Sequence, residues 1–85
     1  MEYLLYEVDL GASSAIEVTL DHAANVLVLD SVNYMHYRSG QQYRYYGGHV
    51  TTSPYVVRPP QPGHWYVVIN LGGYAGTVHA SVRVI

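Results

Sequence analysis

The chain has 85 residues, a formal net charge of −2 and no cysteine. This length supports one domain over residues 1–85, which buries only about 60–65% of its unfolded surface. The lack of cysteine excludes disulfides and thiolate metal sites. The N-terminal residues have no basic segment before an apolar one, and no stretch approaches the roughly 20 apolar residues of a membrane span. We expect a soluble cytoplasmic domain that does not enter membranes.

Charge is distributed unevenly along the chain. All six acidic residues fall in the first thirty positions, whereas the four arginines come later and lysine is absent. Folding can intermingle the two groups and cancel the asymmetry. It can also leave complementary faces that favour self-association or attract an anionic ligand.

The N-terminal third predicts three β-strands. Residues 3–10 and 14–21 alternate between apolar and polar side chains, the period of a strand with one buried face. Residues 24–29, with the sequence ANVLVL, are apolar at nearly every position. A continuous apolar run of this length is typical of a central strand that is covered on both faces.

The middle of the chain loses the strand period at Asp30. Apolar residues at helical spacing predict a short helical turn near residues 31–39, with Asp30 or Ser31 as its N-cap. Beyond it we expect a short strand at 42–46 that ends at two glycines. Further short strands are expected at 49–52 and 55–58.

The C-terminal part begins with a proline-rich turn at 59–63, because proline donates no ladder hydrogen bond. Residues 64–71 and 77–85 alternate again, and the glycine-rich residues 70–76 between them predict a hairpin connection. Trp65 is the expected core anchor. The sum of about seven or eight short strands indicates an all-β fold, a small antiparallel β-sandwich of jelly-roll-like form.

Residues 33–49 differ most from this β pattern. They hold five tyrosines, two arginines, two histidines, three glycines and no acidic residue. Decorated loops on a rigid scaffold often carry binding, and tyrosine gives large contact area at low entropy cost. We predict a ligand- or partner-binding face here, joined by three residues from neighbouring strands. Its members are Asn33, Tyr34, Tyr37, Arg38, Tyr43, Arg44, Tyr45, Tyr46, His49, Tyr55, His64 and Tyr66.

The chain offers little for catalysis. The five histidines lack the local spacing of zinc sites, and no serine lies in a G-x-S-x-G elbow. We therefore predict no metal, no cofactor and no enzymatic activity. Arginines interleaved with tyrosines are typical of stacking platforms for nucleic acids, but four arginines against six acids make a poor electrostatic footprint.

Three runs of the sequence also suggest a family. The segments ANVLVLDSVNYMHYRSG, YRYYGGHVTTSPY and GHWYVVINLGGYAGTVHASVRV resemble the bacterial family called domain of unknown function 1883. The similarity extends from about Ala24 to Val84. It implies a small β-sandwich that occurs alone or beside a TIR-type domain. It implies no established activity and assigns no site residues.

Two hypotheses about function follow. The first is a non-enzymatic binding or sensor module that recognises a small ligand, a glycan or a protein partner through the tyrosine- and arginine-rich segment. The second is a self-assembling structural module that forms homo-oligomers through complementary charged faces.

Overall fold

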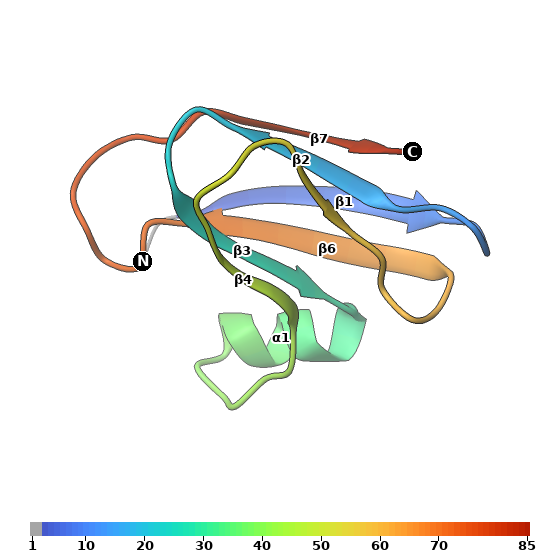
Figure 1. Cartoon of the computed structure of the whole chain (residues 1–85). Helices are drawn as coiled ribbons and strands as arrows, with labels where there is room; N and C mark the ends of the chain where they lie inside the picture. Colours follow the sequence, from blue (N-terminus) through green and yellow to red (C-terminus); the bar gives the residue numbers. More distant parts are fainter. Residues whose placement is uncertain (1–2) are drawn as a thin grey trace.

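The computed structural model describes residues 3–85 as two antiparallel sheets and one helix (Figure 1). One sheet has four strands in the order β1-β6-β3-β4, and the other has three in the order β5-β2-β7. The elements are β1 (Leu4–Leu10), β2 (Ile16–Leu20), β3 (Ala24–Leu29), α1 (Ser31–Arg38), β4 (Tyr46–Val50), β5 (Tyr55–Val57), β6 (Gly63–Asn70) and β7 (Ala80–Val84). The predicted all-β sandwich with one short helix is confirmed.

The main core lies between the two sheets. Val18 of β2, Val26 of β3 and Val67 of β6 are all fully buried there. The predicted anchor Trp65 is 6% exposed, and its indole Nε1 donates a hydrogen bond to the Gln61 carbonyl oxygen at 3.0 Å. Tyr46 covers one side of this ring, with centroids 5.9 Å apart. The sandwich interior is therefore aliphatic, with a single indole held in place by a hydrogen bond.

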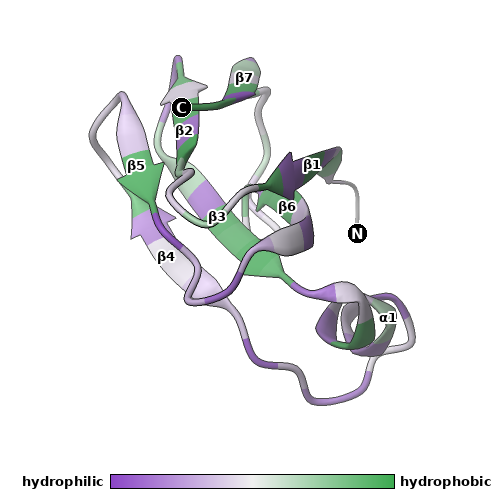
Figure 2. Cartoon of the chain, turned by 90° about the vertical axis from the view of Figure 1, so that its right-hand side faces the viewer, coloured by the Kyte–Doolittle hydropathy of each residue, from purple (hydrophilic) through white to green (hydrophobic). Residues whose placement is uncertain are grey.

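The outer face of the four-stranded sheet has a cover of its own. Figures 1 and 2 show α1 on the side of this sheet that faces away from the three-stranded sheet. Asp30 caps the helix, since its carboxylate accepts a hydrogen bond from the Asn33 N–H at 2.8 Å. The helix packs Tyr34 and Tyr37 against the sheet, whereas Val32, which helped to predict the helix, is 63% exposed.

Strand β3 shows why this second cover is needed. Its residues alternate between the two faces of the sheet, so Val26 and Val28 enter the main core. Leu27 and Leu29 point the other way and pack against Tyr34. The prediction of a central strand covered on both faces is confirmed.

Two local predictions are wrong. No strand forms at 42–46; β4 begins at Tyr46 and runs through both glycines. Gly47 pairs with Leu27, and a Cβ atom there would lie 2.2 Å from the Val26 carbonyl oxygen. The glycine is thus a requirement of close strand pairing at this edge, where the sequence pattern indicated a strand end.

The predicted hairpin at 70–76 is the second error. Strand β6 pairs with β1 and β3, whereas β7 pairs with β2 in the other sheet. The glycine-rich segment therefore carries the chain from one sheet to the other. Glycines marked the turn correctly, but turn residues do not specify which strand the next segment joins. Within residues 3–85, no helix combines the length and apolar character needed to cross a bilayer.

Removal of the core indole should destabilise the fold strongly. Trp65→Ala is expected to lower the free energy of unfolding by about 3–5 kcal/mol, the usual cost of truncating a buried tryptophan. Tyr74→Ala is the control, because the Tyr74 side chain is 84% exposed and should change stability by about 0.5 kcal/mol or less. Urea denaturation followed by circular dichroism measures both. Equal stability of the two variants would contradict the assignment of Trp65 to the core.

Candidate functional site

Six of the ten tyrosines gather on the outer face of the four-stranded sheet, at α1 and the segment that follows it. We call this group the tyrosine layer. Rings from β6, α1 and the connection to β4 meet here, and ring centroids of neighbouring members lie 4.4–5.8 Å apart. The members are Tyr3, Tyr34, Tyr37, Tyr43, Tyr45 and Tyr66.

Tyr34 is the most buried member of the layer, with 8% of its surface exposed. Its ring stacks on Tyr66 with centroids 4.4 Å apart and planes 8° from parallel. Its hydroxyl shares a 3.1 Å hydrogen bond with the Tyr3 hydroxyl. That hydrogen bond, together with burial, raises the pKa of Tyr34 to about 12. The Arg38 guanidinium lies 5.8 Å from the ring centroid, within range of a cation–π contact.

Tyr37 links the layer to a row of polar side chains on the sheet. Its ring meets Tyr3 and Tyr43 edge-on, at centroid distances of 5.3 and 5.2 Å. Burial raises the pKa of the Tyr37 hydroxyl, so the group is neutral at physiological pH. This hydroxyl accepts a hydrogen bond from Asn70 Nδ2 at 3.2 Å and keeps a proton that it can donate.

The polar row crosses three neighbouring strands. Asn70 on β6 is 6% exposed, and its Oδ1 accepts hydrogen bonds from Asn25 Nδ2 at 3.0 Å and from the Gly72 N–H at 2.9 Å. Asn25 Oδ1 lies 3.2 Å from His49 Nδ1. Because an amide oxygen only accepts, Nδ1 carries the hydrogen, and Nε2 is the acceptor of the neutral ring.

Three rings of the tyrosine layer and the polar row together line an open cavity of about 320 Å³, which we call the outer-face groove. Tyr37 of α1 and two rings from the segment after the helix form its walls, and the polar row forms its floor. Its lining contains no Asp, Glu, Lys or Arg among residues 3–85. The six side chains with ring or hydrogen-bonding groups in it are Asn25, Tyr37, Tyr43, Tyr45, His49 and Asn70.

His64 occupies the other end of the same sheet face. Its Nδ1 lies 2.8 Å from Asp9 Oδ1 and its Nε2 lies 2.9 Å from Glu7 Oε1. Ionised carboxylates only accept hydrogen bonds, so this geometry requires both ring nitrogens to carry protons. The bonds to Asp9 and then Glu7 raise the pKa of His64 above its ordinary value of 6.5. Tyr66 meets the imidazole edge-on at 5.0 Å, which connects this cluster to the tyrosine layer.

The structure distributes the predicted binding residues among several places. Tyr37, Tyr43, Tyr45 and His49 converge in the outer-face groove. Tyr34 and Tyr66 lie under the helix, and His64 lies in the carboxylate cluster. Tyr46 packs on Trp65, and Tyr55 packs against the main core from β5.

Asn33, Arg38 and Arg44 hold the helix and the segment after it. Asn33 Nδ2 donates to Asp30 Oδ1 at 2.9 Å, while its Oδ1 accepts from the Arg44 N–H at 2.7 Å. Arg38 lies beside the Tyr34 ring, and the Arg44 side chain is exposed. These contacts fix the course of the segment that supplies the groove walls.

Asn25 and Asn70 belong to the groove but are not among the predicted binding residues. Asn25 interrupts the apolar strand β3 and Asn70 ends β6, and each has the same parity as residues on the outer face of its strand. The period-two pattern assigns each amide to one face of its own strand. That the two amides face each other follows only once the pairing of β3 with β6 is known.

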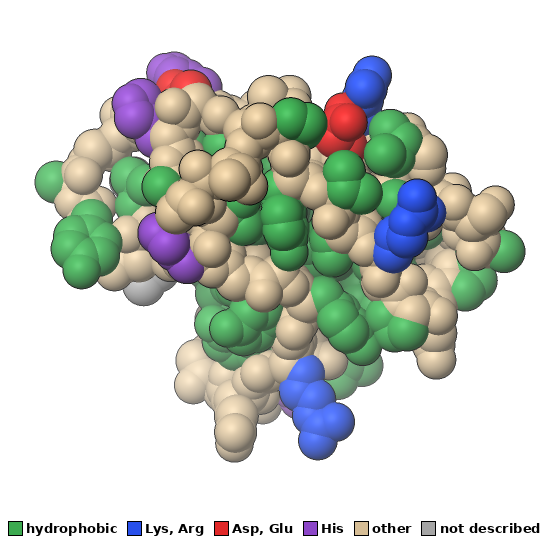
Figure 3. Space-filling model, in the orientation of Figure 1, with side chains coloured by type: hydrophobic (Ala, Val, Ile, Leu, Met, Phe, Trp, Pro, Cys, Tyr) green, Lys and Arg blue, Asp and Glu red, His purple; other side chains and the backbone are tan. Residues whose placement is uncertain are grey.

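Basic and metal-ligating side chains are considered next, within residues 3–85. Figure 3 shows the basic side chains on the visible face as separate residues, without a continuous patch. In the part of the chain that the structure describes, no group of three or more His, Asp or Glu side chains is arranged to hold a metal ion. The outer-face groove therefore offers aromatic and neutral hydrogen-bonding chemistry.

Comparison with known proteins agrees with the sequence resemblance. The family model described as Domain of unknown function (DUF1883) matches residues 1–85, the whole chain. The chain belongs to the DUF1883 family. No curated protein and no solved structure matches it. Since DUF1883 membership assigns no activity, the function has to be argued from the groove and its surroundings.

The carboxylate cluster gives a prediction about pH. The pKa of His64 is higher in the folded state than its ordinary value of 6.5, so protonated His64 contributes its full stabilisation to the fold below pH 6.5. This contribution is lost as the pH rises through the raised folded-state pKa. NMR titration of the imidazole should place its pKa above 6.5, and Asp9→Asn or Glu7→Gln should each lower it. Glu17→Gln is the control, since Glu17 pairs with Arg83 and should leave His64 unchanged. A His64 that titrates at or below 6.5 would contradict its hydrogen bonds to Asp9 and Glu7.

Proposed function

We propose that this chain is a non-enzymatic binding module whose outer-face groove takes a small, neutral, hydroxyl-rich ligand such as a saccharide. The observation that carries the proposal is the composition of the groove. Three tyrosine rings and three hydrogen-bonding side chains line it together, without a charged side chain. Apolar walls with a few convergent polar groups are the usual composition of a small-molecule site.

The rings suit the apolar faces of a sugar. Tyr37 and Tyr43 are 84° from parallel, and Tyr43 and Tyr45 are 47° from parallel, so the walls approach from different directions. Tyr37 is held by Asn70, and Tyr45 is 46% exposed at the mouth. Rings held in place before binding cost little entropy when a ligand arrives.

The floor suits hydroxyl groups. The Tyr37 hydroxyl can donate and His49 Nε2 can accept, so the groove presents both partners that a ligand hydroxyl needs. An ion would find no opposite charge in the lining, and the loss of its hydration would be uncompensated. A volume of about 320 Å³ lies at the lower end of the roughly 300–1,000 Å³ of small-molecule sites. One or two sugar rings are therefore the expected size.

Two adjacent tyrosines make a matched test of this proposal. Tyr45 lines the groove and is 46% exposed, whereas Tyr46 is 45% exposed and packs on Trp65 outside the groove. Saturation-transfer NMR with neutral mono- and disaccharides should identify a binder. Tyr45→Ala should weaken it about two- to tenfold, since an aromatic contact is worth roughly 0.5–1.5 kcal/mol. Tyr46→Ala should leave the affinity unchanged.

Two results would overturn the saccharide proposal. One is the lack of a saturable signal from any sugar in a panel of glucose, galactose, mannose, N-acetylglucosamine and their disaccharides. The other is an equal loss of affinity in the Tyr45 and Tyr46 variants while both are folded, as judged by the dispersion of their amide spectra. The second result would mean that the ligand binds outside the groove.

Self-assembly is a second candidate function, favoured by β7, which is an edge strand of the three-stranded sheet within residues 3–85. The Tyr6 hydroxyl donates to the Ala80 carbonyl oxygen at the start of this edge, so the later residues of β7 are the ones considered for pairing. Ala15 and Ile85 exchange two backbone hydrogen bonds of 2.9 Å, so alternate residues of β7 direct their backbone groups towards β2. Val82 and Val84 consequently direct theirs away from the sheet, and Val84 is 41% exposed. A second copy of β7, added antiparallel about a two-fold axis, would pair these groups.

Charged faces contribute less to this second candidate than the edge does. Glu17 forms an ion pair with Arg83, and Glu7 and Asp9 share His64, so most of this charge is matched within one chain. Assembly through β7 should therefore depend weakly on salt, since backbone hydrogen bonds and apolar contacts are little screened.

A charge on the free edge tests the second candidate. Light scattering coupled to size exclusion should show dimers of the native chain as its concentration rises from micromolar to millimolar. Val84→Lys should shift the population to monomers, because lysine on an edge strand opposes pairing. Val32→Lys is the control on the exposed side of α1, where Val32 is 63% exposed. A native chain that is monomeric throughout, or dimers that persist in Val84→Lys, would refute assembly through this edge.

A further inference from the structure

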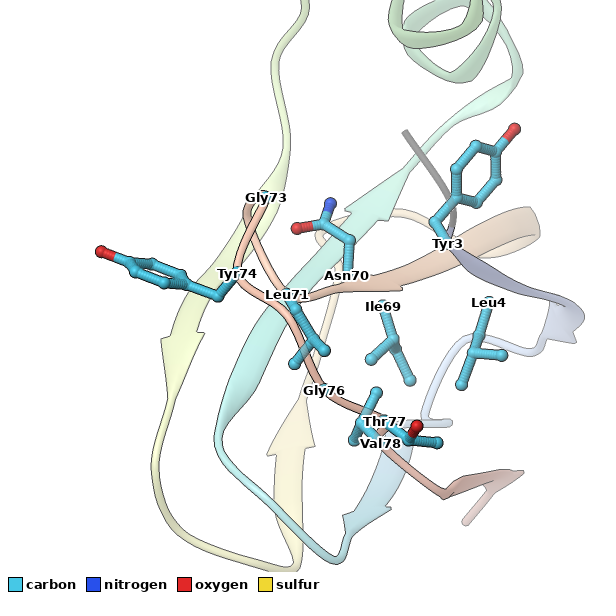
Figure 4. Close-up of a pocket in the computed structure, with 10 residues that line it drawn as sticks. All are labelled: Tyr3, Leu4, Ile69, Asn70, Leu71, Gly73, Tyr74, Gly76, Thr77 and Val78. Atoms are coloured by element: carbon cyan, nitrogen blue, oxygen red, sulfur yellow. The ribbon is translucent and has the colours of Figure 1, made fainter.

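A second cavity lies at the end of the sandwich where the chain crosses between the sheets. The connection from β6 to β7 passes over this end, and beneath it is an open cavity of about 750 Å³ (Figure 4). We call it the sandwich-end cavity. Strands β1 and β6 supply one wall, and the connection supplies the other.

Aliphatic side chains form the inner part of this cavity. Ile69 is 1% exposed and belongs to the main core, and Leu4, Leu71 and Val78 pack against that core. In Figure 4, Leu4 and Ile69 project side by side from β1 and β6 towards Thr77 and Val78 of the connection. The cavity is therefore continuous with the apolar interior of the sandwich.

The mouth of the cavity adds aromatic and neutral polar groups. Tyr74 lies on the connection, and Figure 4 shows its ring pointing away from the aliphatic side chains, where it is 84% exposed. No Asp, Glu, Lys, Arg or His lines the cavity among residues 3–85. Asn70 reaches it from β6, but its oxygen already accepts from Asn25 and Gly72. A charged ligand would find no partner for its charge.

We propose that the sandwich-end cavity binds the alkyl or aryl group of a neutral, largely apolar small molecule. Its volume of about 750 Å³ falls within the roughly 300–1,000 Å³ range of ligand pockets that are lined mainly by apolar side chains. Displacing water from aliphatic walls provides the driving force for such a ligand. This site is separate from the outer-face groove, which is lined by tyrosines and amides, although Asn70 borders both.

A neutral fluorescent probe tests the proposal on the whole chain. N-phenyl-1-naphthylamine becomes bright in apolar surroundings, and its titration should saturate at one probe per chain. Addition of 1-decanol should displace it, because an alkyl chain competes for the same walls. Thr77→Phe places a ring in the cavity from an exposed position, and we expect it to weaken the probe about tenfold or more.

Three further variants make the outcome decisive. Val56→Phe adds the same ring on β5, where Val56 is 45% exposed, and should retain native affinity. Tyr45→Ala alters the outer-face groove and should also retain it. Val78→Phe fills the cavity from the neighbouring position on the same connection and replaces the first variant if Thr77→Phe does not fold. Amide NMR spectra establish which variants are folded.

The results separate this inference from the saccharide proposal. Loss of probe binding in a folded cavity variant, with retention in the Val56 and Tyr45 variants, supports the sandwich-end cavity. A native chain without saturable probe binding overturns it. It is also overturned if a folded Thr77→Phe or Val78→Phe chain binds the probe with native affinity, or if Tyr45→Ala alone abolishes binding.

Discussion

The central strands of the larger sheet are apolar on both faces, and the rest of the fold follows from the need to cover them. Val26 and Val67 point into the sandwich, whereas Leu27 and Val68 point outwards. The three-stranded sheet covers the first set. The outward set would expose aliphatic surface to water at a cost of about 25 cal/mol per Å² without a second cover. Helix α1 and the tyrosine layer provide that cover.

Tyrosine is suited to this second cover because the layer is thin. A tyrosine ring can pack one side on apolar surface, while its hydroxyl reaches another polar group or water. Tyr34 bonds Tyr3, and Tyr37 bonds Asn70. The rings that stabilise the outer face are thus continuous with those that wall the groove. Changes at the inner members should affect stability first, whereas changes at the outer member Tyr45 should affect binding first.

Much of the fold could be predicted from local patterns. The alternation in β1, β2 and β6, the apolar run in β3 and the helix start near Asp30 each depend on a few neighbouring residues, and the structure confirms these elements. Of the two N-cap candidates, Asp30 and Ser31, the structure has Asp30. The errors concern partners that are distant in sequence. The path of residues 71–79 and the strand at Gly47 depend on which strands become neighbours, and single-strand periodicity contains no information about that.

For the candidate site, too, local composition was informative, whereas contacts between residues distant in sequence were not. The concentration of tyrosine in residues 33–49 indicated a contact surface, and four of the predicted residues line the groove. The pattern could not separate rings that pack on the sheet, such as Tyr34, from rings at the mouth, such as Tyr45. It also could not join Asn25 to Asn70, which are 45 positions apart and meet only because β3 pairs with β6.

The separation of aromatic types has a spectroscopic consequence. The chain has one tryptophan, which lies in the main core, while six of its ten tyrosines form the layer on the other side of the sheet. Excitation at the red edge of indole absorption reports on the sandwich interior alone. Tyrosine absorption is weighted towards the opposite face. The two halves of the molecule therefore carry different intrinsic chromophores, and fraying of the helical cover can be distinguished from collapse of the sandwich without any added label.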